Sequence, residues 1–179
     1  ITVDYPANFM LVASMNPCPC GYHNHPEKEC VCSPATVKRY LNKISGPLLD
    51  RIDLHVEATP VSYDELSSVR PTSESSSDIV ERVIKARERQ RERFANSKGV
   101  FCNAQMPGNM VREYCQLDSA CLNLLKTAMK RLQLSARAYD RILKVARTAA
   151  DLGDSDAIQV AHLAEAIQYR SLDREGWAG

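Results

Sequence analysis

The chain has 179 residues, of which 44% are hydrophobic and 25% charged, and its formal net charge is +1. This length allows one hydrophobic core or two small ones, and the near-cancelling charges give no reason to expect a polyanionic partner. No apolar run approaches the ~20 residues that cross a bilayer, and the first residues do not form a secretory signal. We therefore expect a cytoplasmic protein with no membrane partner.

The first sixty residues predict a mixed α/β structure. Residues 9–15 form a continuous apolar run, which is typical of a strand buried in a parallel sheet. Ser33 and Pro34 are typical of the start of a short helix running towards Ile44, and residues 52–56 alternate like a second strand. The sequence opens without Met and almost directly with an apolar strand, so we expect it to be part of a longer protein.

Residues 67–78 are rich in serine and predict a linker, and the remainder predicts a bundle of four or five helices. Asp78 is expected to cap a helix that begins at Ile79. The apolar stripe of this helix consists of Ile79, Val80, Val83 and Ile84. Further helices are expected at residues 110–116, 118–132, 135–152 and 157–170. Ser135 should cap the third of these four helices, and Gly153 should end it.

Three polar residues occupy positions suited to nucleotide chemistry. Asn16 follows the first predicted strand, where an amide can orient a water molecule. Arg51 lies on the turn before the second strand, and its guanidinium can reach a phosphate of a neighbouring molecule. Arg137 lies in the first turn of a helix, where a cation is unfavourable unless it meets an anion. Their ordinary alternatives are an Asx turn, a surface pair with Asp50 or Asp53, and an exposed helical arginine.

The order of these residues resembles that of AAA+ ATPases, in which they are called sensor one, the arginine finger and sensor two. The segments FMLVASMNPCPCG, CSPATVKRYLNKISGPLLDRIDLHVE and LSARAYDRILKVARTAADL resemble the magnesium-chelatase-like family of ComM and YifB. The resemblance covers almost the whole chain except the serine-rich linker. It implies that Asn16 is sensor one, Arg51 the arginine finger and Arg137 sensor two, with Arg141 as the alternative to Arg137.

The resemblance also implies a fold class and a set of ligands. Residues 1–66 should be an α/β remnant of an AAA+ core, residues 67–78 a linker, and residues 79–179 an all-α helical lid bundle. The full-length protein should bind ATP and Mg²⁺ and form a ring of its own subunits, which we expect to be a hexamer. The family carries a P-loop, G-x-x-x-x-G-K-S/T, and an acidic Walker B strand, and this sequence contains neither. We therefore expect no ATP hydrolysis by this chain alone.

Proteins of the ComM type are similar to ring helicases that act on branched DNA during natural transformation. The resemblance therefore implies an ATP-driven motor that works on DNA, with a chelatase-type metal-insertion ATPase and a simple interaction module as alternatives. The basic residues of one predicted helix are Arg82, Lys85, Arg87, Arg89, Arg91 and Arg93. Interleaved glutamates favour a solvated face for that helix, and contact with DNA phosphates is the alternative.

Four of the seven cysteines form two C-x-C motifs separated by nine residues. These cysteines are Cys18, Cys20, Cys30 and Cys32. Four thiolates complete a tetrahedral zinc site, and a metal would order a loop that has few apolar residues. His23 and His25 offer alternative ligands, while a reduced loop and two disulfides are the alternatives to zinc. Cys102, Cys115 and Cys121 are expected to be small buried side chains.

Overall fold

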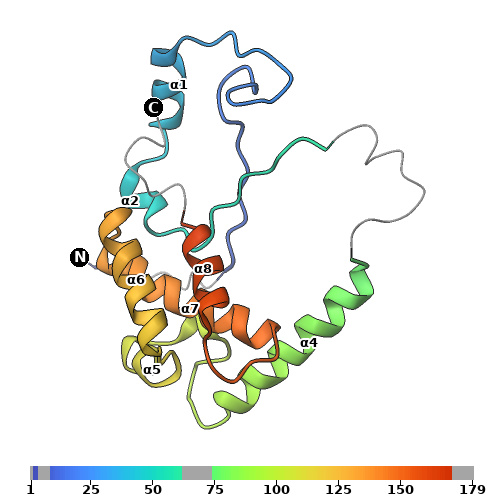
Figure 1. The fold of residues 1–179 in the computed structure, drawn as a ribbon, viewed down its shortest axis with the longest axis vertical. Helices are drawn as coiled ribbons and strands as arrows, with labels where there is room; N and C mark the ends of the chain where they lie inside the picture. Colours follow the sequence, from blue (N-terminus) through green and yellow to red (C-terminus); the bar gives the residue numbers. More distant parts are fainter. Residues whose placement is uncertain (1, 4–8, 62–73, 171–179) are drawn as a thin grey trace. The chain divides into compact units, whose positions relative to one another are not determined.

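The computed structural model describes residues 2–3, 9–61 and 74–170 (Figure 1). These residues fall into two compact units, the first ending at Lys43 and the second beginning at Ile44. Most of the expected linker at residues 67–78 lies outside the described residues, and the domain boundaries predicted from the sequence stay predictions. Within the described ranges, no helix is both long enough and apolar enough to cross a membrane.

The first unit contains one helix, α1 (Pro34–Leu41), which begins where the sequence predicts. The Ser33 hydroxyl accepts a hydrogen bond from the Thr36 amide, and Pro34 occupies the first helical turn. Val37 and Leu41 form the buried side of α1. The residues before α1 are a series of turns that carry the four paired cysteines.

The two predicted strands do not form, and all regular structure in the described residues is helical. Residues 9–15 lie in neither a strand nor a helix, and their apolar side chains are exposed, 82% in the case of Val12. In residues 52–56, His55 is buried whereas Leu54 and Val56 are exposed. A strand needs neighbouring strands to pair its amides and carbonyls, and the described residues supply none. The all-α part of the predicted fold class is therefore observed, and the α/β remnant is not.

The second unit is helical, and its helices match the predicted ones to within a few residues. Its elements are α2 (Gly46–Leu49), α4 (Ser76–Arg93), η1 (Asn103–Gln105), α5 (Gly108–Tyr114), α6 (Ser119–Arg131), α7 (Ala136–Leu152) and α8 (Val160–Gln168). Side-chain caps fix the starts of α6 and α7, since Asp118 accepts from the Cys121 amide and Ser135 from the Ala138 amide. The short helix α2 was not predicted, because its Gly-Pro start indicates a break.

Helix α7 is the centre of the bundle and packs against α4, η1, α5 and α8 (Figure 1). Its inner face carries Ala138, Ala146 and Ala150, all fully buried, which lets neighbouring helices approach closely. Ile142 of α7 and Leu163 of α8 are also fully buried and fill the space between the helices. A cluster this dense makes α7 a rigid support for the residues at its two ends.

The C-terminal end of α7 is closed by a Schellman motif. The Ser155 amide donates to the Ala150 carbonyl at 2.8 Å, and the Asp154 amide donates to the Asp151 carbonyl at 3.2 Å. Asp154, not Gly153, takes the left-handed conformation, with a φ of 54°. Gly153 is the last capping residue, as predicted, and Asp154 turns the chain so that its carboxylate meets Arg89 of α4 at 2.7 Å.

Helix α4 begins at Ser76 rather than at Ile79. Ser75 is the cap, and Asp78 completes a capping box by accepting from the Ser75 amide. The predicted apolar stripe is not buried: Ile79, Val80, Val83 and Ile84 are each at least 40% exposed. Both buried residues of α4, Ala86 and Gln90, lie in its C-terminal half.

A buried polar network joins α4 to the far end of α7. The Asp151 carboxylate accepts from Arg93 at 2.6 and 2.7 Å and from the Asn103 amide at 2.8 Å, and it lies 3.1 Å from Arg147. Burial raises the pKa of Asp151, but the hydrogen bonds from Arg93 and Asn103 outweigh burial and hold that pKa below its usual range. Asp151 is therefore the charged centre of the bundle.

We predict that replacing Asp151 with Asn costs about 3 kcal/mol of unfolding free energy, because the buried Arg147 loses its counter-charge. Since the folded-state pKa is lowered, this stabilisation is present above the unfolded-state pKa of about 3.9 and is lost as the pH falls through the folded-state value. Urea unfolding between pH 3 and pH 7 measures both effects. The control is Asp156→Asn, because Asp156 is 97% exposed and pairs with Arg89 at 2.9 Å. Equal losses in the two variants would contradict the prediction.

Candidate functional site

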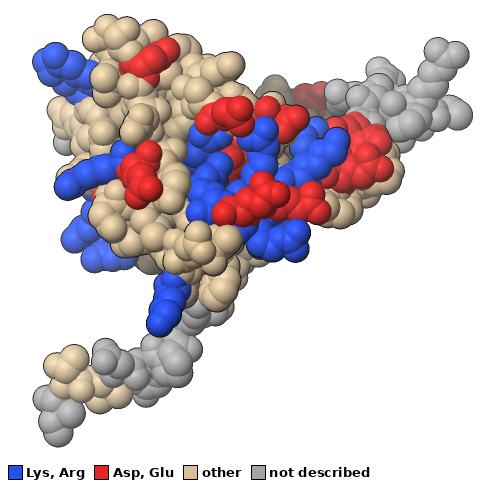
Figure 2. Space-filling view, turned by 90° about the horizontal axis from the view of Figure 1, so that it is seen from below, with Lys and Arg blue, Asp and Glu red and all other residues tan. Residues whose placement is uncertain are grey.

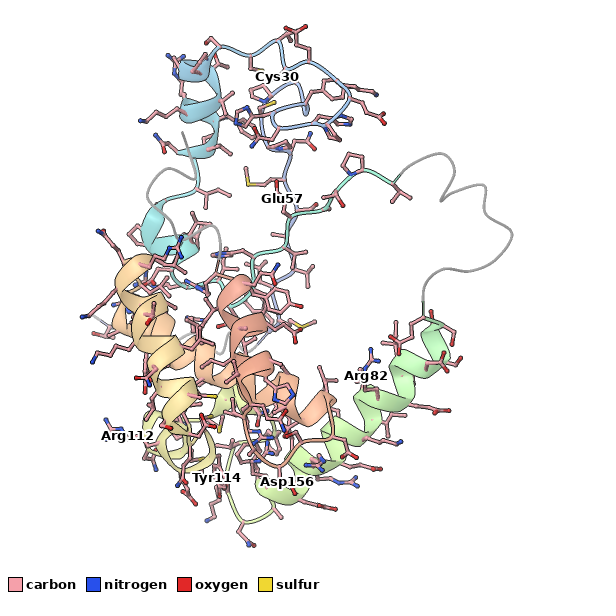
Figure 3. All side chains as sticks on the ribbon, viewed as in Figure 1. Cys30, Glu57, Arg82, Arg112, Tyr114 and Asp156 are labelled. Atoms are coloured by element: carbon pink, nitrogen blue, oxygen red, sulfur yellow. The ribbon has the colours of Figure 1, made fainter. Side chains whose placement is uncertain are left out.

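The loop before α1 brings the four paired cysteines into one cluster, and Figure 3 labels one of them, Cys30. The Sγ atoms of Cys18, Cys20, Cys30 and Cys32 all lie within 4.8 Å of one another. The Sγ atom of Cys18 is 3.3 Å from that of Cys20 and 3.7 Å from that of Cys30. Sulfurs bound ~2.3 Å from a zinc ion form a tetrahedron with edges of about 3.8 Å. The cluster therefore has the size and donor set of a four-cysteine zinc site.

The chemical state of the cysteines and the local turns agree with this arrangement. All seven cysteines lie in described residues, and all are free thiols, so the alternative of two disulfides is not what the structure shows. The Gly21 amide donates to the Cys18 carbonyl at 3.0 Å, and Gly21 has a φ of 83°, a conformation that favours glycine. This turn brings Cys18 and Cys20 to the same side of the loop.

The two histidines of the loop do not join the cluster. His25 uses its Nδ1 atom to accept from the amides of Glu27 and Lys28, both at 3.1 Å. Its ring also meets the ring of Tyr22 edge-on, with centroids 5.7 Å apart. His25 therefore stabilises the outer part of the loop, and the candidate ligand set consists of the cysteines.

The thiols of the cluster differ in their pKa values. The Tyr22 amide and neighbouring thiols donate to Cys20 and lower the pKa of Cys20 to about 6. For Cys30, the Cys32 amide favours the thiolate, but desolvation and the neighbouring cysteines outweigh it and raise the pKa to about 12. Burial and the neighbouring cysteines thus disfavour the ionisation of Cys30 and of Cys32, whose pKa is also raised.

Arg51, the predicted arginine finger, lies on the exposed turn after α2 in the second unit. Its guanidinium donates to the Pro47 carbonyl at 2.6 Å. The two acids near it bind residues of α7 or its cap: Asp50 accepts from the cap residue Ser135, and Asp53 pairs with Arg141. Within residues 9–61 and 74–170, Arg51 forms no ion pair with a carboxylate, so the surface pair considered from the sequence is not observed.

Asp50 connects the Arg51 turn to the start of α7. The Ser135 hydroxyl donates to the Asp50 carboxylate at 2.6 Å, and this bond, followed by the nearby charges of Arg170 and Arg137, lowers the pKa of Asp50 despite burial. Arg137 is held only loosely, since its side chain is 65% exposed and lies 3.6 Å from Asp50. Such an exposed pair contributes little and can exchange its carboxylate for another anion.

Two functional candidates in this region were missed in the sequence. Arg170 follows α8, is 1% exposed, and donates to the carbonyls of Ile52 and Asp50. His55 is also buried, and its amide donates to the Tyr169 carbonyl at 2.8 Å. In the sequence, Arg170 looks like an ordinary cation at a helix C-terminus, and no local pattern reveals that it is buried.

Asn16, the predicted sensor one, is exposed and lies in the first unit, next to Gly21. Arg51, Arg137 and Arg141 lie in the second unit, where α7 joins the two lid arginines to the acids that flank Arg51. The structure therefore places the predicted finger arginine, Arg51, in the same unit as Arg137 and Arg141. The four cysteines lie in the other unit.

Sequence profiles of known families match nearly the whole chain. The family described as "Magnesium chelatase, subunit ChlI C-terminal" matches residues 73–170, and "Magnesium chelatase, subunit ChlI" matches residues 1–66. The chain belongs to the magnesium chelatase ChlI family. This confirms the resemblance noted from the sequence motifs.

Several relatives from this family are similar along most of the chain. YifB of Escherichia coli is 43% identical over 174 residues, and competence protein ComM of Haemophilus influenzae is 40% identical over 172 residues, each alignment covering 96% of this chain. The Mycobacterium bovis protein Mb2921c is 39% identical over 166 residues, or 93% of the chain. These alignments cover 33%, 32% and 32% of the respective relatives, so the chain spans about a third of their length.

The thiol pKa values predict an order of chemical reactivity in the metal-free cluster. Cys20 should be alkylated by iodoacetamide first, because a pKa of about 6 leaves it mostly thiolate at pH 7, whereas Cys30, with a pKa of about 12, should react last. Mass spectrometry after brief labelling at pH 7 in the presence of a chelator measures the order. The half-buried Cys102, which lies outside the cluster, is the internal reference. Equal labelling of Cys20 and Cys30 would contradict the prediction.

Proposed function

We propose that this chain is the C-terminal part of an AAA+ ATPase and that Arg51 acts at the ATP bound to a neighbouring subunit of a ring. The observation that carries this proposal is the state of Arg51. The acids on either side of Arg51 bind residues at α7: Asp50 accepts from Ser135, and Asp53 pairs with Arg141. The Arg51 guanidinium is exposed and donates to the Pro47 carbonyl. Membership of the magnesium chelatase ChlI family supports the assignment to an AAA+-type protein.

An arginine presented in this way stabilises the charge that develops on a transferred phosphoryl group. The guanidinium is planar and always charged, and it can donate two hydrogen bonds to phosphate oxygens. To do so, Arg51 exchanges its bond to the Pro47 carbonyl, which water can replace on an exposed surface. ATP and Mg²⁺ would be held mainly by the P-loop and Walker B residues of the full-length protein.

Asn16 and Arg137 are proposed to act at the γ-phosphate as sensor one and sensor two. Asn16 would orient the attacking water through its amide. Arg137 would leave its loose contact with Asp50 when a phosphate becomes available, which couples the nucleotide to α7. Arg141 is the alternative to Arg137, although its pairing with Asp53 makes it less ready to exchange partners.

The work driven by ATP is proposed to be done on DNA, as the resemblance to ComM-type ring proteins implies. The basic residues of α4 give this part of the proposal little support. Arg82, Arg89 and Arg93 pair with carboxylates, and Figure 2 shows basic and acidic side chains interleaved over this face. DNA contacts would therefore depend on other parts of the full-length ring.

We predict that Arg51→Ala in the full-length protein lowers ATP turnover by ~10³-fold or more, while ATP binding is retained. The matched control is Arg112→Ala, which removes an exposed arginine of α5 far along the chain from the turn. Mixing Arg51→Ala subunits with P-loop-defective subunits should restore part of the turnover, because one subunit then supplies its arginine to another's ATP. Assays with and without branched DNA test the motor, for which DNA should raise turnover. Normal turnover by Arg51→Ala would refute the proposed role.

We also propose that the four cysteines bind one structural zinc ion. The sulfur distances and the donor set fit such a site, and four thiolate ligands leave no open position for water or substrate. The zinc would therefore have no catalytic role. It would order the loop between Asn16 and Ser33, and so fix the exit of the sensor-one segment and the entry to α1.

Protein purified under reducing conditions without chelator should contain about one zinc ion per chain, as measured by elemental analysis. The double variant Cys20→Ser/Cys30→Ser should lose the metal, whereas Cys102→Ser should keep it. Because the ligands must be deprotonated, zinc should be released progressively as the pH falls below neutral. An almost zinc-free wild-type protein with four freely reactive thiols would refute the site and leave a reduced loop.

A further inference from the structure

The main chain on both sides of Arg51 is tied to the end of a single distant helix. Arg170 donates to the carbonyl of Ile52 and, at 3.4 Å, to the carbonyl of Asp50, and its guanidinium lies 3.9 Å from the Asp50 carboxylate. One residue earlier, the Tyr169 carbonyl accepts from the His55 amide at 2.8 Å. These residues lie more than one hundred positions from the turn in the sequence, as in the Arg170–Ile52 bond, whose separation is 118.

Because Arg170 is buried, its guanidinium depends on these hydrogen bonds within the protein. The Arg170 side chain is 1% exposed, so water cannot replace its hydrogen-bond partners, and an unpaired guanidinium in such a place would be strongly destabilising. Two of its donors are directed at main-chain carbonyls of residues 50 and 52 rather than at flexible side chains. The contact therefore restrains the backbone from which Arg51 projects.

The turn itself is closed by further hydrogen bonds. The Leu49 carbonyl accepts from the Ile52 amide at 3.0 Å, and it also lies 3.3 Å from Nε2 of the buried His55. With the His55 amide bound to the Tyr169 carbonyl, and Arg170 bound to the carbonyls of Asp50 and Ile52, the chain is attached to the end of α8 on both sides of Arg51. Arg51 is an exposed residue within the segment from Leu49 to His55, as are Asp53 and Leu54.

We propose that Arg170 is a positioning residue for Arg51, which sets the direction in which the finger arginine leaves its turn. The inference rests on the function proposed for Arg51. A displacement of the backbone by about 1 Å at an active site can cost ~10²-fold in rate, so a restraint on this turn matters for a residue that must reach another subunit. Through Arg170, the position of α8 determines the position of Arg51.

A purely stabilising role for Arg170 predicts something different. In that case its removal would lower the unfolding free energy and leave the chemistry of the remaining folded ring unchanged. Arg170→Lys separates the two roles, because lysine keeps the charge and stem but lacks the fork that reaches two carbonyls at once. Arg131→Lys is the matched control, since Arg131 lies at the C-terminal end of a helix, as Arg170 lies just beyond α8, but is exposed.

The experiment compares these variants with Arg51→Ala in the full-length protein, and with the double variant Arg51→Ala/Arg170→Lys. We expect Arg170→Lys to lower kcat for ATP roughly 10- to 100-fold with little change in KM, and Arg131→Lys to behave like the wild type. The double variant should be no slower than Arg51→Ala alone, because a finger that is absent cannot be mispositioned. Hydrogen exchange of residues 49–56 should be faster in Arg170→Lys than in the control.

Each result decides a different claim. If Arg51→Ala keeps normal turnover, the proposed function itself fails. If Arg51→Ala is inactive while Arg170→Lys matches the control in kcat, the positioning role is refuted and the role of Arg51 stands. A double variant that is slower than Arg51→Ala by the full effect of Arg170→Lys, or unchanged exchange at residues 49–56, would also overturn the positioning role.

Discussion

The buried guanidinium of Arg170 must satisfy its hydrogen-bond donors without water, and it does so on the main chain of a turn far away in the sequence. Asp50 strengthens this connection, because its carboxylate faces Arg170 and accepts from Ser135 at the start of α7. The turn is thereby attached to two helices of the bundle. The backbone of Arg51 is restrained in this way, while its side chain stays exposed.

The two arginines proposed to act on nucleotide, Arg51 and Arg137, lie in one compact unit. The turn of the proposed finger belongs to the same compact unit as the helices that carry the proposed sensor-two arginine. Arg137 and Arg141 bind the acids on either side of Arg51, so nucleotide that attracts Arg137 also removes a partner from Asp50. A single set of polar contacts thus offers a route by which the two arginines influence one another.

The sequence predicted the helices well because their signals are local. Ser33, Asp118 and Ser135 each cap a helix through their own side chains, and the alanine-rich face of α7 follows helical spacing. The cysteine cluster was also predictable, since two C-x-C motifs bring their sulfurs together through short turns. These features need only contacts between residues that are close in the sequence.

The failures concern contacts that depend on distant partners. Residues 9–15 have the composition of a buried strand, but a strand requires pairing that composition cannot supply. The apolar stripe of α4 has helical spacing, yet its side chains stay at least 40% exposed. Arg170 and His55 were missed because only tertiary packing buries them.

The most direct measurement is a structure of the full-length ring with a transition-state analogue of ATP hydrolysis. Our account predicts the Arg51 guanidinium within about 3 Å of the γ-phosphate mimic of the neighbouring subunit, with Arg170 still bound to its turn; an Arg51 that contacts no nucleotide in the closed ring would contradict it.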